Sequence, residues 1–148
     1  TMSKRKKKIM SLKESEPQVN AFVEKVKELS EGLYYISETD AEIFPFSGTK
    51  AESVSKEEIL RQTNNEPKTP VEERDFAEIF ARLTATEDWF GEEENAIVGK
   101  FSALQKFLEE NLKDLKVFKI GSIQLDVYFV GLDAESNLMG IQTKAVET

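Results

Sequence analysis

The chain has 148 residues, of which 39% are hydrophobic and ten are phenylalanine, so it can bury one hydrophobic core and fits a single domain. It contains neither histidine nor cysteine, which excludes Ser-His-Asp and Cys-His catalysis, zinc bound by histidine or thiolate, and a disulfide framework. The formal net charge is −8, which either serves solubility alone or, because such a surface repels nucleic acid, favours a basic protein partner.

The first residues carry an opposite, positive charge. Residues 4–8 form the basic run Lys-Arg-Lys-Lys-Lys, and without these five the chain has 15 basic against 28 acidic residues, a balance of −13. Residues 1–15 are polar and aperiodic, which predicts a disordered arm, and Thr1 before Met2 is typical of a cloning remnant. A nucleic-acid or membrane-binding arm is the alternative, although no aromatic residue interleaves the run. Residues 16–148 are expected to form the folded domain.

The sequence also bears on where the protein acts. The basic run is followed by the polar residues 11–16 rather than by an apolar stretch of signal-peptide length, and no stretch is long enough to span a membrane. The absence of cysteine is compatible with a reducing compartment, and we therefore expect a cytoplasmic location.

The first predicted element is an amphipathic helix that ends near Gly32, a residue typical of helix C-termini. At its start, residues 15–18 combine the capping-box spacing with an early proline. Its apolar face consists of Val19, Phe22, Val23, Val26, Leu29 and Leu33, which recur at helical intervals. Residues 33–49 are aromatic and contain Pro45, which predicts extended segments at a sheet edge, with a polar loop at 37–40.

Two short helices are predicted next. Ser55 begins the first, which runs to Gln62, and residues 63–70 form a loop by composition. The second covers about residues 75–83. Its apolar residues have the spacing i, i+3, i+4 and i+7 and are Phe76, Ile79, Phe80 and Leu83.

The longest predicted helix runs from about Phe90 to Leu112. Its apolar residues are spaced by four, three, four and four, and are expected to form a core-facing stripe of Ile97, Phe101, Leu104, Leu108 and Leu112. Three glutamates, at positions 92–94, occupy its first turn, where the positive end of the helix dipole stabilises carboxylates.

The end of the chain predicts antiparallel strands. Residues 117–120 form a short strand, and a second strand is expected where Ile123, Leu125, Val127 and Phe129 alternate with more polar residues and build one packed face. Residues 133–137 supply a turn before the last strand, from 138 to about 147. Most of the predicted helices precede the C-terminal strands, which follow the long helix, and this order indicates the α+β class.

The most informative pattern covers residues 84–148. It combines the only tryptophan, in the segment Thr-Ala-Thr-Glu-Asp-Trp-Phe at 84–90, with an acidic helix start at 91–96 and a strand pair at 121–128 and 140–148 that ends in Val-Glu-Thr. This arrangement resembles the nuclease A inhibitor family, whose members block a sugar-non-specific endonuclease. Before residue 84, the resemblance is confined to short matches at 30–33, 36–38 and 59–63.

The resemblance implies a fold and a function. The family folds as an α/β/α sandwich with a mainly antiparallel sheet, and its members are inhibitors, not enzymes, that need no cofactor. The implied partner is a magnesium-dependent, sugar-non-specific DNA/RNA endonuclease, and we expect a monomer or a 1:1 complex without direct contact to nucleic acid or membrane. An acidic binding module of the same fold with another basic partner is the alternative, because specificity resides in loops such as 39–49.

Thr148 is the first of three positions that the resemblance identifies. In the family, the C-terminal threonine enters the nuclease active site and reaches its catalytic magnesium. A hydroxyl and a terminal carboxylate are hard oxygen donors of the kind that magnesium accepts, so Thr148 is expected to contact the partner's ion, while this chain holds no metal of its own. Without the family, Thr148 would be interpreted as a frayed terminus.

Glu38 is the second position. It matches a glutamate that family members place against arginines of the nuclease, where a carboxylate forms charge-assisted and often bidentate hydrogen bonds. The same arginines would otherwise hold substrate phosphates. Considered alone, Glu38 is a solvated loop carboxylate.

Trp89 is the third position, and the family places its matching tryptophan in the inhibitory interface. By residue type alone, Trp89 is either a core anchor, since tryptophan is highly buried on average, or an interface residue, since large aromatics dominate protein contacts and pair well with arginine. Glu87 and Glu147 are expected to be weaker members of the same partner-binding patch.

Catalysis by the chain itself would have to use carboxylates, such as those at 92–94 or Asp40 with Glu42. Consecutive helical residues point in different directions, and nothing in the pattern orients a general base in a cleft. The sequence therefore favours an inhibitor over an enzyme.

Overall fold

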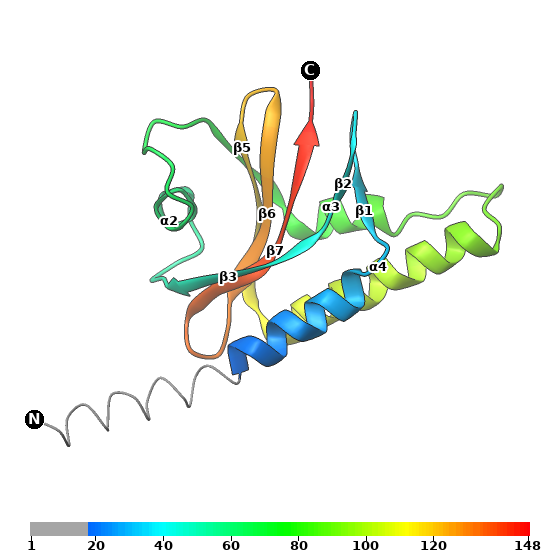
Figure 1. Cartoon of the computed structure of the whole chain (residues 1–148), viewed down its shortest axis with the longest axis horizontal. Coiled ribbons are helices and arrows are strands. Elements are labelled where there is room, and N and C mark those ends of the chain that lie inside the picture. Colours follow the sequence, from blue (N-terminus) through cyan, green and yellow to red (C-terminus); the bar gives the residue numbers. More distant parts are fainter. Residues whose placement is uncertain (1–17) are drawn as a thin grey trace, which may run out of the picture.

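The predicted helices and strands assemble into three layers, an α/β/α sandwich of the α+β class (Figure 1). The computed structural model describes residues 18–148. The expected arm at 1–15 and the helix start around Pro17 lie outside the described residues, and the domain start at residue 16 stays a prediction.

The middle layer is a five-stranded antiparallel sheet in the order β3-β7-β6-β5-β4, and β1 and β2 form a separate antiparallel hairpin. The strands are β1 (Tyr34–Ile36), β2 (Asp40–Glu42), β3 (Phe44–Lys50), β4 (Val71–Asp75), β5 (Lys113–Gly121), β6 (Gln124–Leu132) and β7 (Asn137–Val146). The helices are an N-terminal helix whose described part covers 18–30, α2 (Lys56–Gln62), α3 (Phe76–Leu83) and α4 (Glu92–Asn111). Within residues 18–148, none of these helices combines the length and apolar character needed to cross a lipid bilayer.

The helices begin and end where local chemistry predicts. The N-terminal helix stops before Gly32, whose φ of 77° is a backbone conformation that glycine adopts without strain. Ser55 caps α2 by accepting a hydrogen bond from the amide of Glu58, and Asp75 caps α3 in the same way. The three glutamates of the predicted acidic start lie in the first turn of α4.

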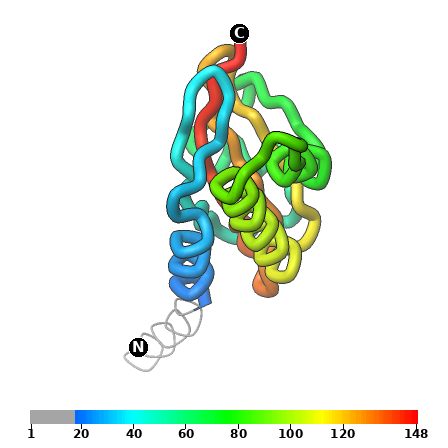
Figure 2. Tube along the Cα trace, turned by 90° about the vertical axis from the view of Figure 1, so that its right-hand side faces the viewer, coloured from blue at the N-terminus to red at the C-terminus, as the bar shows by residue number. Residues whose placement is uncertain are grey.

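Both faces of the sheet are covered. The N-terminal helix, α3 and α4 pack on one face, where Phe80, Leu104 and Phe129 are buried in the larger hydrophobic cluster. Figure 2 shows the N-terminal helix beside α4, and Phe22 meets Phe107 between them with ring centroids 5.4 Å apart. On the opposite face, α2 buries Ile59 and Leu60 in a second cluster. This second covered face explains why β6 is apolar on both faces from Phe129 onward.

Four expectations differ from the structure. Ile97 is 46% exposed rather than in the core, because the first turns of α4 extend beyond the sheet and only the part from Phe101 onward packs against it (Figure 1). Ile123 is 55% exposed because it lies in the turn before β6. The strand predicted at 117–120 is longer, spanning nine residues as β5. Sequence analysis also missed β4, whose charged residues suit an exposed edge strand.

Candidate functional site

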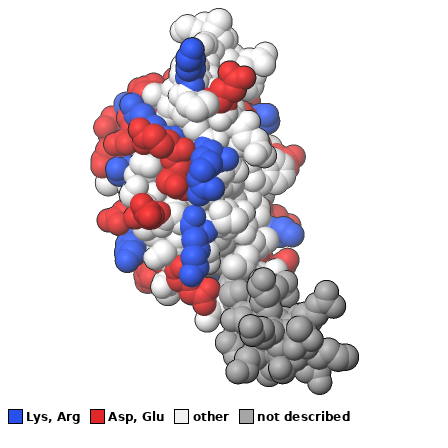
Figure 3. Space-filling view, turned by 90° about the vertical axis from the view of Figure 1, so that its left-hand side faces the viewer, with Lys and Arg blue, Asp and Glu red and all other residues white. Residues whose placement is uncertain are grey.

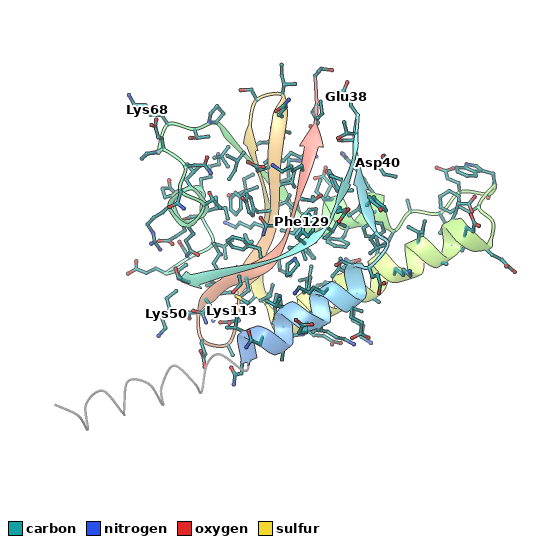
Figure 4. The ribbon with its side chains drawn as sticks, viewed as in Figure 1. Glu38, Asp40, Lys50, Lys68, Lys113 and Phe129 are labelled. Atoms are coloured by element: carbon teal, nitrogen blue, oxygen red, sulfur yellow. The ribbon has the colours of Figure 1, made fainter. Side chains whose placement is uncertain are left out.

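The polar loop predicted at 37–40 is the turn of the β1–β2 hairpin, and it lies against the end of β7 (Figure 4). Within the turn, the Ser37 amide donates to the Thr39 carbonyl at 2.9 Å. Toward β7, the Glu38 amide donates to the Val146 carbonyl at 3.2 Å, and the Val146 amide donates to Ser37 Oγ at 3.0 Å. The hairpin therefore holds the chain where β7 ends.

Glu38 and Thr148 are brought into direct contact, although 110 positions separate them in the sequence. The Thr148 amide donates to Glu38 Oε2 at 2.9 Å, and the Thr148 hydroxyl donates to Glu38 Oε1 at 2.8 Å. We call this pair the clasp. Both residues are exposed, and each oxygen of the clasp keeps a free lone pair, because carboxylate and hydroxyl oxygens each have two acceptor positions.

Glu147 points to a different partner. Its amide donates to the Ile123 carbonyl at 3.0 Å, and its carboxylate accepts a hydrogen bond from Lys119 Nζ at 2.8 Å. The side chain of Lys119 is only 6% exposed, whereas that of Glu147 is 42% exposed. Sequence analysis did not single out Lys119, although the signal was present as one lysine inside the apolar run at 117–120.

Trp89 lies outside the core, with 71% of its surface exposed, in the loop that joins α3 to α4. Its ring meets the ring of Phe90 edge-to-face, with centroids 4.7 Å apart. The loop, β1 and the first turns of α4 enclose an open groove of about 500 Å³. We call it the apolar groove, since its exposed lining includes Tyr34, Ile36, Trp89 and Ile97.

The predicted residues therefore form two groups. Trp89 and Glu87 both line the apolar groove, whereas Glu38 and Thr148 form the clasp. The β1–β2 hairpin connects the two, because Ile36 of the groove precedes Glu38 by two residues. No hydrogen bond joins the groups within residues 18–148, and Glu147 faces Lys119 instead of either group.

Both groups have carboxylates without a basic partner nearby, although Arg82, which pairs with Glu78 at 3.4 Å, also lines the apolar groove. Six carboxylates of the hairpin and the α3–α4 loop region form no ion pair with a lysine or arginine in the described part of the chain, namely Glu38, Asp40, Glu42, Glu87, Asp88 and Glu94. On the face that carries α2, by contrast, basic and acidic side chains are interspersed (Figure 3), as in the 2.7 Å pair of Arg61 with Glu58. From 18 to 148, no three acidic side chains gather closely enough to hold a metal ion.

Two comparisons bear on this site. A family model described as "Nuclease A inhibitor-like protein" matches residues 20–148, a span that includes the hairpin, the apolar groove and the clasp. No curated protein matches the chain.

Proposed function

This chain belongs to the nuclease A inhibitor-like family, which supports a role as a nuclease inhibitor, and from that premise we propose that it blocks the active site of a magnesium-dependent, sugar-non-specific endonuclease without being an enzyme itself. The observation that carries the proposal is the clasp. It joins a carboxylate and a hydroxyl, matched by the family resemblance to two inhibitory residues, into one exposed unit.

The clasp has the chemistry to occupy a phosphate-binding active site. Guanidinium groups that hold substrate phosphates also bind carboxylates through charge-assisted hydrogen bonds, and Glu38 keeps acceptor positions for them. Thr148 donates its hydroxyl proton to Glu38 Oε1, so the lone pairs of its oxygen stay free for a cation. Oxygen is the donor that magnesium prefers. In this proposal, the partner's arginines and its magnesium ion are engaged side by side.

The apolar groove supplies the second contact. Trp89 is a large, rigid aromatic side chain with most of its surface exposed, as expected for an anchor in a protein interface. Glu87 and Glu94 also line the groove, and they favour a partner segment in which apolar and basic residues adjoin. An arginine of such a segment can stack on the indole ring.

The unpaired carboxylates of the hairpin and the α3–α4 loop region would steer a basic nuclease toward this edge of the molecule. We propose a cytoplasmic monomer that binds one nuclease and has no contact of its own with nucleic acid or a membrane. Glu147 is a weaker candidate for direct contact, because one of its carboxylate oxygens is already bonded to Lys119.

The first prediction is stoichiometric inhibition. When the protein is titrated into a magnesium-dependent, sugar-non-specific nuclease, DNA degradation should fall to near zero at about one inhibitor per nuclease. The association rate constant should decrease as salt rises, because charge accelerates the encounter. Full nuclease activity in large excess of the protein would instead favour an acidic binding module with another basic partner. DNA degradation by the protein alone in magnesium would contradict both.

The second prediction concerns the hydroxyl of Thr148. Thr148→Val removes this oxygen with little change of shape, and we expect about tenfold weaker binding, or about 1.4 kcal/mol. Binding should be measured by calorimetry with and without magnesium, since the metal dependence should shrink in this variant. Thr148→Ser keeps the hydroxyl and should behave like the parent. Equal affinity and equal magnesium dependence of the Val variant would show that the hydroxyl does not meet the metal.

A further inference from the structure

We propose that Lys119 is a positioning residue, which holds the segment after β7 in place so that Thr148 is presented in one orientation. This proposal rests on the proposed inhibitory function but concerns a residue outside the contact surface. Lys119 is 5% exposed in β5, on the sheet face that packs against the larger hydrophobic cluster, and its ammonium group donates a hydrogen bond to Glu147 near the chain end.

The burial of Lys119 makes the loss of this pairing costly. An ammonium group withdrawn from water is costly unless it is paired and hydrogen-bonded. Within residues 18–148, Lys119 Nζ donates to a single acceptor, Glu147 Oε2, at 2.8 Å. If Glu147 moved away, the ammonium would stay buried without a partner. The chain immediately before Thr148 is therefore held in place by a charge inside the fold.

The three successive residues 146–148 are held by contacts that come from alternate sides. The hairpin bonds Val146 through Ser37 and Thr148 through Glu38. The β5–β6 side bonds Glu147, through Lys119 and through the carbonyl of Ile123. Successive backbone amides of an extended chain point in opposite directions, so this alternation continues the pattern of a strand beyond the end of β7. Hydrogen bonds thus hold the segment from 146 to 148 on both of its sides.

Such fixation matters for binding, because a segment that is already ordered loses less conformational entropy when it enters a partner's active site. The exposed hydrogen bonds of the clasp compete with water and would not order a mobile segment alone. The ion pair of Glu147 with the buried Lys119 supplies the missing restraint. Glu147 therefore shares this positioning role, because it is the residue through which Lys119 acts on the chain end.

The first arm of the test uses the free protein. Lys119→Met removes the ammonium but keeps an apolar stem of similar length in the core. We expect the ¹H–¹⁵N heteronuclear NOE of the Glu147 and Thr148 amides to fall from values like those of β7 to values of a flexible end. Lys116→Met is the matched control, because Lys116 lies on the same strand in an exposed 3.8 Å pair with Glu73. Unchanged order at 147 and 148 in Lys119→Met would overturn the proposal.

The second arm measures binding to the nuclease. Lys119→Met should weaken it about tenfold, the effect of ordering a mobile chain end on binding, whereas Lys116→Met should not. In a Thr148→Val background, Lys119→Met should have little further effect, because it acts through Thr148. Fully additive losses would overturn the positioning role. Should Lys119→Met not fold, Glu147→Ala is the second variant, because it removes the same pair from its exposed end and should cause the same loss of order at 147 and 148.

The two arms separate this proposal from the inhibitory function. If the parent protein binds no nuclease, the proposed function fails, while the NMR arm still decides whether Lys119 orders the chain end. If the parent inhibits and the chain end stays ordered in Lys119→Met, only the positioning role fails.

Discussion

Glu38→Ala is expected to weaken the complex with the nuclease by about 2–5 kcal/mol, since it leaves guanidinium groups of the partner buried without their carboxylate. The structure adds a second reason for the loss. Without Glu38, the amide and hydroxyl of Thr148 lose both of their acceptors, so the variant also releases the residue proposed to reach the magnesium ion. The dissociation constant, measured by calorimetry or surface plasmon resonance, checks this expectation.

Asp40→Ala is the matched control for Glu38→Ala. Asp40 lies on the same hairpin and is also exposed, but within residues 18–148 no hydrogen bond joins its side chain to the chain end (Figure 4). Its removal should slow association slightly through the loss of one charge and leave the dissociation rate unchanged. The unfolding temperature of the free protein should barely change in either variant, because both side chains are at the surface. If Glu38→Ala bound as tightly as the parent, Glu38 would serve only to close the hairpin against β7.

Trp89→Ala is expected to weaken binding by about 2 kcal/mol or more, as truncation of an aromatic anchor commonly does. Because Trp89 is 71% exposed and its ring meets that of the neighbouring Phe90 outside the core, its loss should leave the free energy of unfolding nearly unchanged. The measurement pairs a binding assay with thermal unfolding of the free protein. Together, the two measurements distinguish a tryptophan that anchors the core from one that contacts the partner.

Phe44→Ala is a suitable control for Trp89→Ala. Phe44 is an aromatic residue of β3 with 53% exposure, similar in kind but not part of the apolar groove. It should affect neither binding nor stability strongly. A marked drop in the unfolding temperature of Trp89→Ala would show that this residue stabilises the fold. Unchanged affinity for the nuclease would show that the apolar groove is not part of the interface.

Local patterns predicted the elements whose signals lie close together in the chain. The cap at Ser55, the stop at Gly32 and the apolar spacing of α3 all act within one or two turns, so the sequence alone places them. The same reasoning failed for Ile97. Its helical spacing is correct, but burial depends on whether another layer faces that turn, and in this fold the sheet does not reach it.

By itself, the sequence determined the α+β class, the acidic character and the resemblance that the family match over 20–148 confirms. Only the tertiary structure decided how the indicated residues relate to each other. Hydrogen bonds join Glu38 to Thr148 and Lys119 to Glu147, across separations of 110 and 28 positions. The periodicity of the sequence cannot predict such contacts, because they depend on how a hairpin and two sheet strands pack around one segment. The exposure of Trp89 was decided in the same way, by a loop that extends beyond the layers.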